Sequence, residues 1–478
     1  MDKRLLLLGS LCAVTTQATQ AADQTRPNII VILADDLGYN DVGFTGETPI
    51  QTPNLNKLAE SGVIFTNGHC NHPFSGPSRA ALMSGRYQQR FGFETNPAYD
   101  PDNPYMGIST DEKLFPARLQ EVGYTTGIIG KWHLGATELH NPMNRGFDYF
   151  YGFLGGGHDY FSINKSKRVW EAYEQELIRN TKPATFDGYI TTAFSEDAVR
   201  FVEDNKDNPF FLYLAYNAPH TPLQAPKEDI ERYSHIEDKR KRTYAAMVDV
   251  MDRGIGTVVD ALKRNGLYEN TIIFFTSDNG GPQEKANSKL SSFTDNTPYR
   301  AGKGSTYEGG HHVPYILCWP AKVKGGIEYN YPVNALDISR TAVALAGADA
   351  ESAPAMEGVN LIPFVTGEEK GAPHEAIFWR SGSVWAVLGS DGTKQVLGKG
   401  NGKPEQYYLP DDLGEENDII NRSKKDIKRA EELKTLWDKW NESNIPCSMM
   451  GYLQYHEKLK EFYKSTIPEA ARDKVLKE

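Results

Sequence analysis

Continuous apolar segments recur along most of the chain, separated by segments in which apolar residues follow a helical spacing. The continuous segments are short, and nearly every position in them is apolar. This pattern is typical of strands that are buried on both faces of a parallel sheet. The segments that we expect to form core strands are Asn28–Ala34, Thr125–Gly130, Phe210–Tyr216, Thr271–Ser277 and Val313–Trp319.

The helical spacing is clearest in one segment between these strands. Met247, Met251, Ile255 and Leu262 fall on one helical face, and Gly266 is placed to end the helix. Alternating strands and helices predict an α/β fold, with a doubly wound, mostly parallel sheet flanked by helices. In such sheets ligands bind beyond the carboxyl ends of the strands, so the residues at these ends are the first candidates for a site.

The pattern changes near Pro373. Short strand-like segments follow, such as "AIFWRSG" and "VWAVLGS", and charged helical segments continue towards the end of the chain. We therefore expect a large α/β domain over residues 23–372 and a small α+β C-terminal subdomain over residues 373–478.

Composition and charge narrow the class of partner. Of the 478 residues, 39% are hydrophobic, which suits a folded globular protein. The net charge is −11, so a nucleic acid is not an expected partner, because binding to phosphates requires a basic surface. A small anion remains possible where positive side chains gather in one pocket.

The first residues have the pattern of an export signal. Lys3 and Arg4 precede the apolar segment Leu5–Val14, which is too short to span a membrane, and small residues follow up to Ala22. An ordinary first helix is the alternative. We expect residues 1–22 to be a signal peptide and the protein to be periplasmic or secreted, with no membrane-spanning segment.

Acidic and amide side chains directly follow two of the expected strands. Asp35 and Asp36 come after the first strand, and Asp278 and Asn279 follow the strand Thr271–Ser277. Either pair alone could belong to an ordinary loop. Together they offer only oxygen ligands, which calcium and magnesium prefer, so a divalent cation site is expected at this edge of the sheet.

Basic side chains follow other strands of the same sheet. Lys131 and His133 stand just after one strand, His220 after another, and Lys303 precedes a further strand in a glycine-rich segment. Any one of them alone could be structural or solvated. Their recurrence at strand ends favours a pocket that binds an anion.

Ser75 stands two residues before Pro77 and four before Arg79, where a helix is expected to begin. A plain helix cap is one interpretation of this serine. The other is a role in chemistry, because the N-terminus of a helix favours an oxyanion and Arg79 always carries a positive charge. A serine alone is a weak nucleophile and needs activation.

The segment "SGPSRAALMSGR" resembles the signature of the formylglycine-dependent sulfatases, the type I or arylsulfatase-like enzymes of the alkaline phosphatase superfamily. The resemblance also covers "PNIIVILADDLGYND", "GKWHLG", "APHTP", "SDNGG" and "GKGSTYEGG", in the family's order between Pro27 and Pro320. The later segment "YYLPDDLGEENDI" resembles the family's C-terminal motif with an altered start.

The resemblance implies an exported sulfuric ester hydrolase of the serine type. Ser75 would be oxidised to formylglycine (3-oxoalanine) by a radical-SAM sulfatase-maturing enzyme, as in anaerobic bacteria. The reaction would then run through a formylglycine hydrate and a covalent sulfo-enzyme intermediate. The metal would be one calcium ion, with magnesium not excluded, and its implied ligands are Asp35, Asp36, Asp278, Asn279 and the modified Ser75.

The resemblance also gives roles to the basic side chains. Arg79, Lys131 and Lys303 would neutralise the sulfate. His133 would be the base, and His220 would be the acid next to the leaving oxygen.

For the substrate, the chain is most similar to bacterial carbohydrate sulfatases near the N-acetylgalactosamine-4-sulfatases. This similarity implies a galacto-configured sugar, galactose or N-acetylgalactosamine, from mucin, glycosaminoglycan or algal galactan. His158, Asp159 and Arg300 are the candidate substrate-binding residues. A glucosamine-type glycosaminoglycan sulfatase is the alternative, and the sulfated position stays open.

Two other classes share parts of the pattern. A phosphatase or phosphonate hydrolase of the same superfamily with two zinc ions could use the pair His311 and His312, which departs from the expected sulfatase motif. A non-catalytic binder of sulfated glycans could keep the pocket without turnover. The metal content separates the first class, and turnover by matured protein separates the second.

Overall fold

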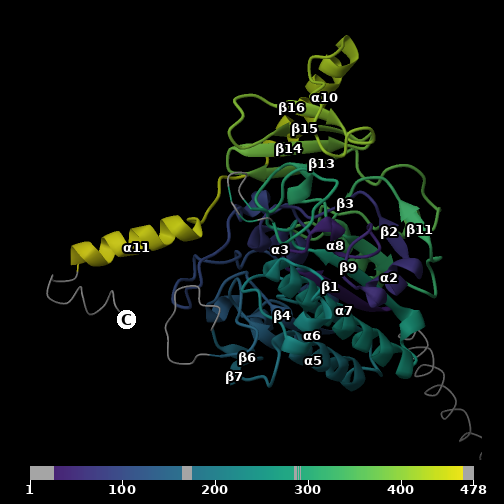
Figure 1. Ribbon diagram of the computed structural model, residues 1–478, viewed down its shortest axis with the longest axis vertical. Coiled ribbons are helices and arrows are strands. Elements are labelled where there is room, and N and C mark those ends of the chain that lie inside the picture. The colour runs from purple at the N-terminus through teal and green to yellow at the C-terminus, as the bar shows by residue number, and fades with distance from the viewer. Residues whose placement is uncertain (1–25, 164–174, 285–287, 289, 291, 467–478) are drawn as a thin grey trace, which may run out of the picture.

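A ten-stranded sheet forms the centre of the larger domain (Figure 1). The computed structural model describes residues 26–163, 175–284, 288, 290 and 292–466. Five parallel strands lie in the middle of the sheet in the order β9-β1-β8-β4-β5. Their bounds are Asn28–Ala34 for β1, Thr125–Lys131 for β4, Tyr149–Phe153 for β5, Phe210–Ala215 for β8 and Thr271–Ser277 for β9.

Shorter strands extend the sheet on both sides. Beyond β9 the order is β10, β2 and β11, and beyond β5 it is β6 and β7. The bounds of these strands are Val63–Phe65 (β2), Leu177–Arg179 (β6), Lys182–Ala184 (β7), Tyr315–Cys318 (β10) and Ile327–Tyr329 (β11). A separate pair is formed by β3 (Gly68–His69) and β12 (Val333–Asn334).

Helices cover both faces of the sheet because successive residues of each central strand point to opposite sides. In β1, Ile30 and Ile32 pack with residues of α2, α5 and α7, whereas Ile29 and Val31 pack with residues of α3, α4 and α8. The helices are α2 (Pro53–Glu60), α3 (Ser75–Ser84), α4 (Phe115–Glu121), α5 (Ile190–Asp204), α6 (Lys227–Arg232), α7 (Lys239–Arg264), α8 (Ala335–Ala346) and α9 (Ile362–Val365).

Short 3₁₀ helices lie in the connections. They are η1 (Tyr39–Asp41), η2 (Gln88–Phe91), η3 (Glu138–His140), η4 (Pro142–Asn144), η5 (Tyr268–Asn270) and η6 (Glu308–Gly310). The last of them follows the segment that contains Lys303, one of the candidate site residues.

A four-stranded antiparallel sheet forms the small C-terminal subdomain, in the order β13-β14-β15-β16. Figure 1 shows it above the large sheet, with α10 packed on it and α11 projecting to one side. The bounds of these elements are Ala376–Ser381 (β13), Val384–Gly389 (β14), Thr393–Leu397 (β15), Glu405–Tyr408 (β16), Lys424–Asn441 (α10) and Tyr452–Thr466 (α11).

The predicted fold class is confirmed. Four of the five expected segments form the central strands β1, β4, β8 and β9, and the fifth forms β10 beside β9, whereas β5 was not expected. The helix α7 ends two residues before Gly266, whose φ of +68° suits a helix terminus. One detail differs, because β10 pairs with β9 in antiparallel orientation. The boundary at residue 373 stays a prediction, and the predicted signal peptide lies outside the described residues.

Among the described residues, no helix combines the length and the apolar character that crossing a membrane requires.

The parallel register brings the predicted site residues to one edge. Ala34 pairs with Ser277, and Gly130 pairs with Ala215, so the residues that follow β1, β4, β8 and β9 emerge side by side. At Gly130 the strands approach so closely that a Cβ would lie 1.9 Å from the carbonyl oxygen of Ala215. Lys131 is the next residue and the last one of β4, so its side chain lies at this edge of the sheet.

An ion pair joins the start of the small subdomain to α8. His374 Nε2 lies 2.9 Å from both carboxylate oxygens of Asp337. Asp337 also accepts hydrogen bonds from the backbone N–H groups of Asn334 and Val359. Burial acts to lower the pKa of His374, but the Asp337 carboxylate outweighs it and raises the pKa.

We expect His374→Gln to lower the free energy of unfolding at acidic pH by on the order of 1–2 kcal/mol. Because the pKa is raised in the folded state, this stabilisation is fully present below the unfolded pKa and is lost as the pH rises through the folded one. Urea unfolding at several pH values measures it, with the exposed His235→Gln as the control. A difference that does not change with pH would contradict this assignment.

Candidate active site

The carboxylates of Asp35, Asp36 and Asp278 lie together at the carboxyl ends of β1 and β9, and all three residues are buried. The N–H of Asp36 donates to Asp278 Oδ1 at 3.2 Å, and Asn279 Nδ2 donates to Asp36 Oδ1 at 2.7 Å. Asp36 has a φ of +64°, which is uncommon outside glycine. This backbone allows two consecutive carboxylates to face the same group of ligands and cations.

Ser75 is the first residue of α3, and its side chain points into the carboxylate group. Its Oγ lies 3.3 Å from Asp35 Oδ1 and 3.1 Å from Asn279 Oδ1. The helix begins at Ser75 itself, and Phe74 occupies the cap position. The hydroxyl is therefore turned towards the carboxylates, which is not the position of a plain cap.

Three cationic side chains pair with these carboxylates. The Arg79 guanidinium lies 2.8 Å from Asp278 Oδ2 and 3.6 Å from Asp35 Oδ1. Lys131 Nζ lies 2.6 Å from Asp35 Oδ2. Lys303 Nζ lies 2.7 Å from Asp36 Oδ1. The charges come from separate segments of the chain, and they balance one another within a single buried group.

The three carboxylates differ in pKa because their surroundings differ. Burial, followed by repulsion from Asp278, raises the pKa of Asp35 to about 7. Burial acts in the same direction on Asp36 and Asp278, but it is outweighed. Lys303 and His220 lower the pKa of Asp36, and Arg79 with both lysines lowers that of Asp278. Asp35 is thus the carboxylate with the least compensated negative charge.

The two lysines respond differently to their sites. Burial lowers the pKa of Lys131 in spite of the Asp35 carboxylate. For Lys303 the carboxylates of Asp36 and Asp35 outweigh burial and raise the pKa. Lys303 therefore stays protonated most firmly, and Lys131 depends on Asp35 for its charge.

His133 and His220 lie on the same side of the sheet as the charged group. His220 Nε2 lies 3.6 Å from Asp36 Oδ2, and its Nδ1 lies 2.6 Å from the carbonyl oxygen of Thr221. Burial lowers the pKa of His220 to about 4, although Asp36 opposes this. Burial, Lys131 and Arg79 hold the pKa of His133 well below its usual range. Both rings are thus neutral near pH 7.

The oxygen atoms at this site fit a divalent cation. Ser75 Oγ, three carboxylates and the amide oxygen of Asn279 are hard oxygen ligands, which calcium and magnesium prefer. His220 lies close enough to Asp35 and Asp36 to join the same group. Burial and then repulsion from Asp278 raise the pKa of Asp35, and a bound cation would favour its ionised form. Because the fixed charges already balance, such a cation would leave the pocket positive and suited to an anion.

The structure places His158 and Asp159 in a loop that follows β5. His158 is fully buried, with Nδ1 2.6 Å from the carbonyl oxygen of Asp159 and Nε2 2.7 Å from that of Gln175. Asp159 accepts hydrogen bonds from the backbone of Phe161 and from Gln224. These contacts shape the loop and turn both ring nitrogens of His158 towards the main chain, so the predicted sugar contact of His158 gains no support.

Arg300 lies against the small subdomain. Its NH1 donates to the carbonyl oxygen of Glu415 at 2.9 Å, and its guanidinium stacks over the Tyr307 ring at 3.9 Å. The side chain is therefore engaged in a contact between the two domains. Its predicted role in substrate binding stays a prediction, and the contacts indicate a structural role.

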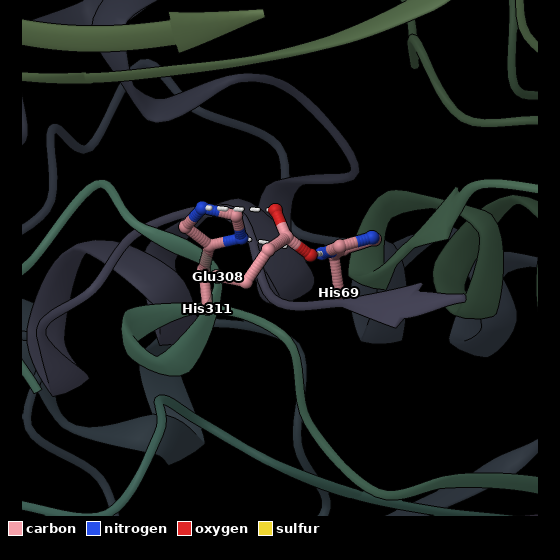
Figure 2. A group of neighbouring side chains, drawn as sticks. All are labelled: His69, Glu308 and His311. Atoms are coloured by element: carbon pink, nitrogen blue, oxygen red, sulfur yellow. Dashed lines mark hydrogen bonds and ion pairs between the residues drawn. The ribbon is translucent and has the colours of Figure 1, made fainter. Parts of the chain in front are cut away.

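The histidines near η6 belong to a separate buried network. Figure 2 shows the Glu308 carboxylate between the rings of His69 and His311. Lys394 Nζ lies 2.7 Å from Glu308 Oε1, 2.8 Å from Glu415 Oε1 and 3.3 Å from His311 Nε2. Lys394 thus donates a hydrogen bond to Glu308, forms an ion pair with Glu415 and contacts the His311 ring.

The histidine rings extend this network. His311 Nδ1 lies 3.2 Å from His69 Nδ1, and His311 Nε2 lies 3.1 Å from the carbonyl oxygen of Thr306. His69 Nε2 lies 2.7 Å from Asn67 Oδ1. His312 lies 2.7 Å from Glu308 Oε2. The hydrogen bonds use the nitrogens that a zinc ion would need, so the geometry favours a charged joint between the domains over a second metal site.

Lys394 and Glu415 were missed by sequence reasoning. Lys394 lies in a short strand with no surrounding motif, and Glu415 lies in a segment where several acidic residues follow one another. Their 0% exposure and their ion pair become visible only when the small sheet packs against η6. Gln175 was also missed, because its contacts with Gly155, Gly157 and His158 form only when the chain folds back on itself.

Comparison with protein families gives a match to the Sulfatase model over residues 27–348. The N-acetylgalactosamine-6-sulfatase of Mus musculus is 32% identical over 403 residues, covering 80% of this chain and 73% of that protein. The uncharacterized sulfatase YdeN of Escherichia coli (strain K12) is 32% identical over 417 residues, covering 76% and 70%.

Solved structures with the same fold include Ps i-CgsB in complex with k-i-k-neocarrahexaose. It is 40% identical, has a TM-score of 0.83, and the match covers 94% of this chain and 99% of that chain. The PsFucS1 sulfatase from Pseudoalteromonas sp. is 26% identical with a TM-score of 0.75, and the match covers 91% and 94%.

We expect the chain to bind one calcium or magnesium ion at the carboxylate group, and Asp36→Asn to weaken this binding by roughly tenfold or more. Metal analysis and isothermal titration calorimetry measure the stoichiometry and affinity, and saturating ion should raise the Tm. Asp391→Asn, in the small sheet, is the control. Two zinc ions per chain, or an unchanged affinity in Asp36→Asn, would contradict the assignment.

Proposed function

The chain belongs to the sulfatase family of sulfuric ester hydrolases, and from this premise we propose that it is an exported enzyme that removes sulfate from galacto-configured sugars of glycans. Its relatives support the more general activity, which is that of a carbohydrate sulfatase. The single observation that supports a reaction at this site is the position of Ser75. Its hydroxyl lies in the buried charged group that the strand ends bring together.

The fixed cations are arranged for a sulfate ester. Arg79 is held by Asp278, Lys131 by Asp35 and Lys303 by Asp36, so each positive charge has a defined place before a substrate arrives. Charge builds on the oxygens of a sulfate ester as the bond to the leaving oxygen breaks. A preorganised donor directed at such charge is typically worth about 3–4 kcal/mol in the transition state.

Two groups beyond the encoded side chains complete the proposed site. A calcium ion held by Asp35, Asp36, Asp278, Asn279 and Ser75 would add positive charge next to the sulfate oxygens. Formylglycine, formed from Ser75 by a radical-SAM maturing enzyme, would supply an aldehyde hydrate in place of a weakly nucleophilic alcohol. The position of Ser75 at the start of α3 would also place it near the positive end of the helix dipole.

The histidines have complementary roles in this proposal. His133 is neutral because burial and Lys131 hold its pKa low, so it accepts a proton. His220 would donate a proton to the leaving oxygen, and for this its pKa must rise from about 4. A bound sulfate ester supplies a negative charge that offsets Lys303 and Lys131 and so raises the pKa of His220.

Two relatives support a galacto-configured substrate. The N-acetylgalactosamine-6-sulfatases carry a galacto-configured sugar in their name, and Ps i-CgsB was solved in complex with k-i-k-neocarrahexaose. The second likeness covers 94% of this chain at 40% identity. Sulfated galactans and related glycans are therefore the substrate class that we propose, ahead of glucosamine-type sugars. Export through residues 1–22 to the periplasm or medium would bring the enzyme to such polymers.

Maturation of Ser75 tests the proposed function. We expect protein made together with a radical-SAM sulfatase-maturing enzyme to contain a Ser75 peptide two mass units lighter, since oxidation to the aldehyde removes two hydrogens. Only this material should release sulfate from sulfated galactose oligosaccharides. Protein made without that enzyme, and Ser75→Ala, should be inactive. Mass spectrometry and sulfate release measure both, and full activity of unmodified protein would refute the proposal.

The role of His220 predicts a dependence on the leaving group. His220→Ala should lower kcat on a sugar sulfate by about 100-fold or more, because an alkoxide leaves poorly without a proton. The same variant should lose far less on an aryl sulfate, whose phenol is much more acidic. Kinetics on both substrates measure this, and His133→Ala, expected to affect both alike, is the matched variant. Equal losses for His220→Ala would remove it from the acid role.

A further inference from the structure

The orientation of the His133 ring depends on packing. His133 has a φ of +61°, and its N–H donates to the carbonyl oxygen of Leu154 at 3.1 Å. Among the described residues, no group hydrogen-bonds its Nδ1. A histidine that transfers protons is usually oriented by a hydrogen bond to one ring nitrogen. Here another contact must hold the ring.

Gly156 provides this contact. A Cβ at this position would lie 2.8 Å from His133 Nε2 and 3.0 Å from Cε1. The φ of Gly156 lies outside the left-handed region, so the backbone alone would accept alanine. A side chain at this position would press on the imidazole, because the main chain of Gly156 forms a wall directly against the ring.

Gln175 holds the loop on both sides of Gly156. Its Oε1 accepts a hydrogen bond from the N–H of Gly155 at 2.7 Å, and its Nε2 donates to the carbonyl oxygen of Gly157 at 2.9 Å. The side chain is 8% exposed. The backbone oxygen of Gln175 also lies 2.7 Å from His158 Nε2, which ties this residue to the loop at a further point.

We propose that Gln175 is a positioning residue for His133, acting through the main chain of Gly155–Gly157. This inference rests on the proposed function, in which His133 accepts a proton. Without the Gln175 amide, the Gly155 N–H and the Gly157 carbonyl lose their partners, and the wall against the ring is released. A small displacement of a catalytic group lowers the reaction rate strongly while substrate binding through other residues is kept.

The test uses the matured, full-length chain and 4-nitrophenyl sulfate. Gln175→Leu keeps a similar volume and removes both hydrogen bonds, and we expect kcat to fall by about 10- to 100-fold with KM within about 3-fold. Gln406→Leu is the matched control. Gln406 is a buried glutamine of the small sheet that donates to the carbonyl oxygen of Asp426, and its loss should lower Tm without changing kcat.

A double-mutant cycle separates positioning from general destabilisation. If Gln175 acts through His133, adding Gln175→Leu to His133→Ala should cost less than about 2-fold in kcat. Additive losses would overturn the inference and leave the proposed function intact. Full activity in His133→Ala would overturn the base role of His133, and with it this inference, whereas the inactivity of Ser75→Ala tests the sulfatase mechanism independently.

Gly156→Ala provides a second variant if Gln175→Leu does not fold. Its Cβ would press on the ring from the same wall, so we expect a similar loss of kcat, again absent in the His133→Ala background. Unchanged kcat in a folded Gly156→Ala would overturn the inference.

Discussion

The burial of three carboxylates at the ends of neighbouring strands is the constraint on which the rest of the structure depends. Removing even one charge from water costs several kcal/mol unless a partner compensates it. Asp35, Asp36 and Asp278 can therefore be buried together only if cations come with them. Arg79, Lys131 and Lys303 meet this need, and the same requirement fixes them in place. The cations that compensate the buried carboxylates are thereby already in place for an anion to bind.

The small subdomain extends this constraint. Lys303 lies in the segment before η6, and Glu308 at the start of η6 is held by Lys394 of the small sheet at 2.7 Å. The backbone N–H of Glu308 donates to Glu415 Oε2 at 2.6 Å. Breaking a buried ion pair of this kind typically costs about 3–5 kcal/mol, because the remaining charge is left without a partner. The C-terminal subdomain thus stabilises the segment that carries one of the cations of the site.

The sequence predicted what depends on local pattern. Continuous apolar segments indicated the central strands, and charged residues at their ends indicated Asp35, Lys131 and Asp278, because parallel strands end at one edge. It could not predict contacts that depend on how distant segments pack. Arg300 lies against Glu415, which is 115 residues away, and Lys394 pairs with Glu308 across 86 residues. No spacing in the chain encodes such pairs.

The positive field of the site links binding to proton transfer in the proposed reaction. In addition to burial, Lys131 lowers the pKa of both His133 and His220, and so keeps them neutral before substrate binds. A neutral ring suits a base but not an acid. The arriving sulfate ester brings the negative charge that offsets the lysines, and His220, 3.6 Å from Asp36, has a carboxylate that favours its protonation. His133 keeps the main chain of Gly156 against its ring. The same lysines can therefore hold one histidine as a base while the substrate itself prepares the other as an acid.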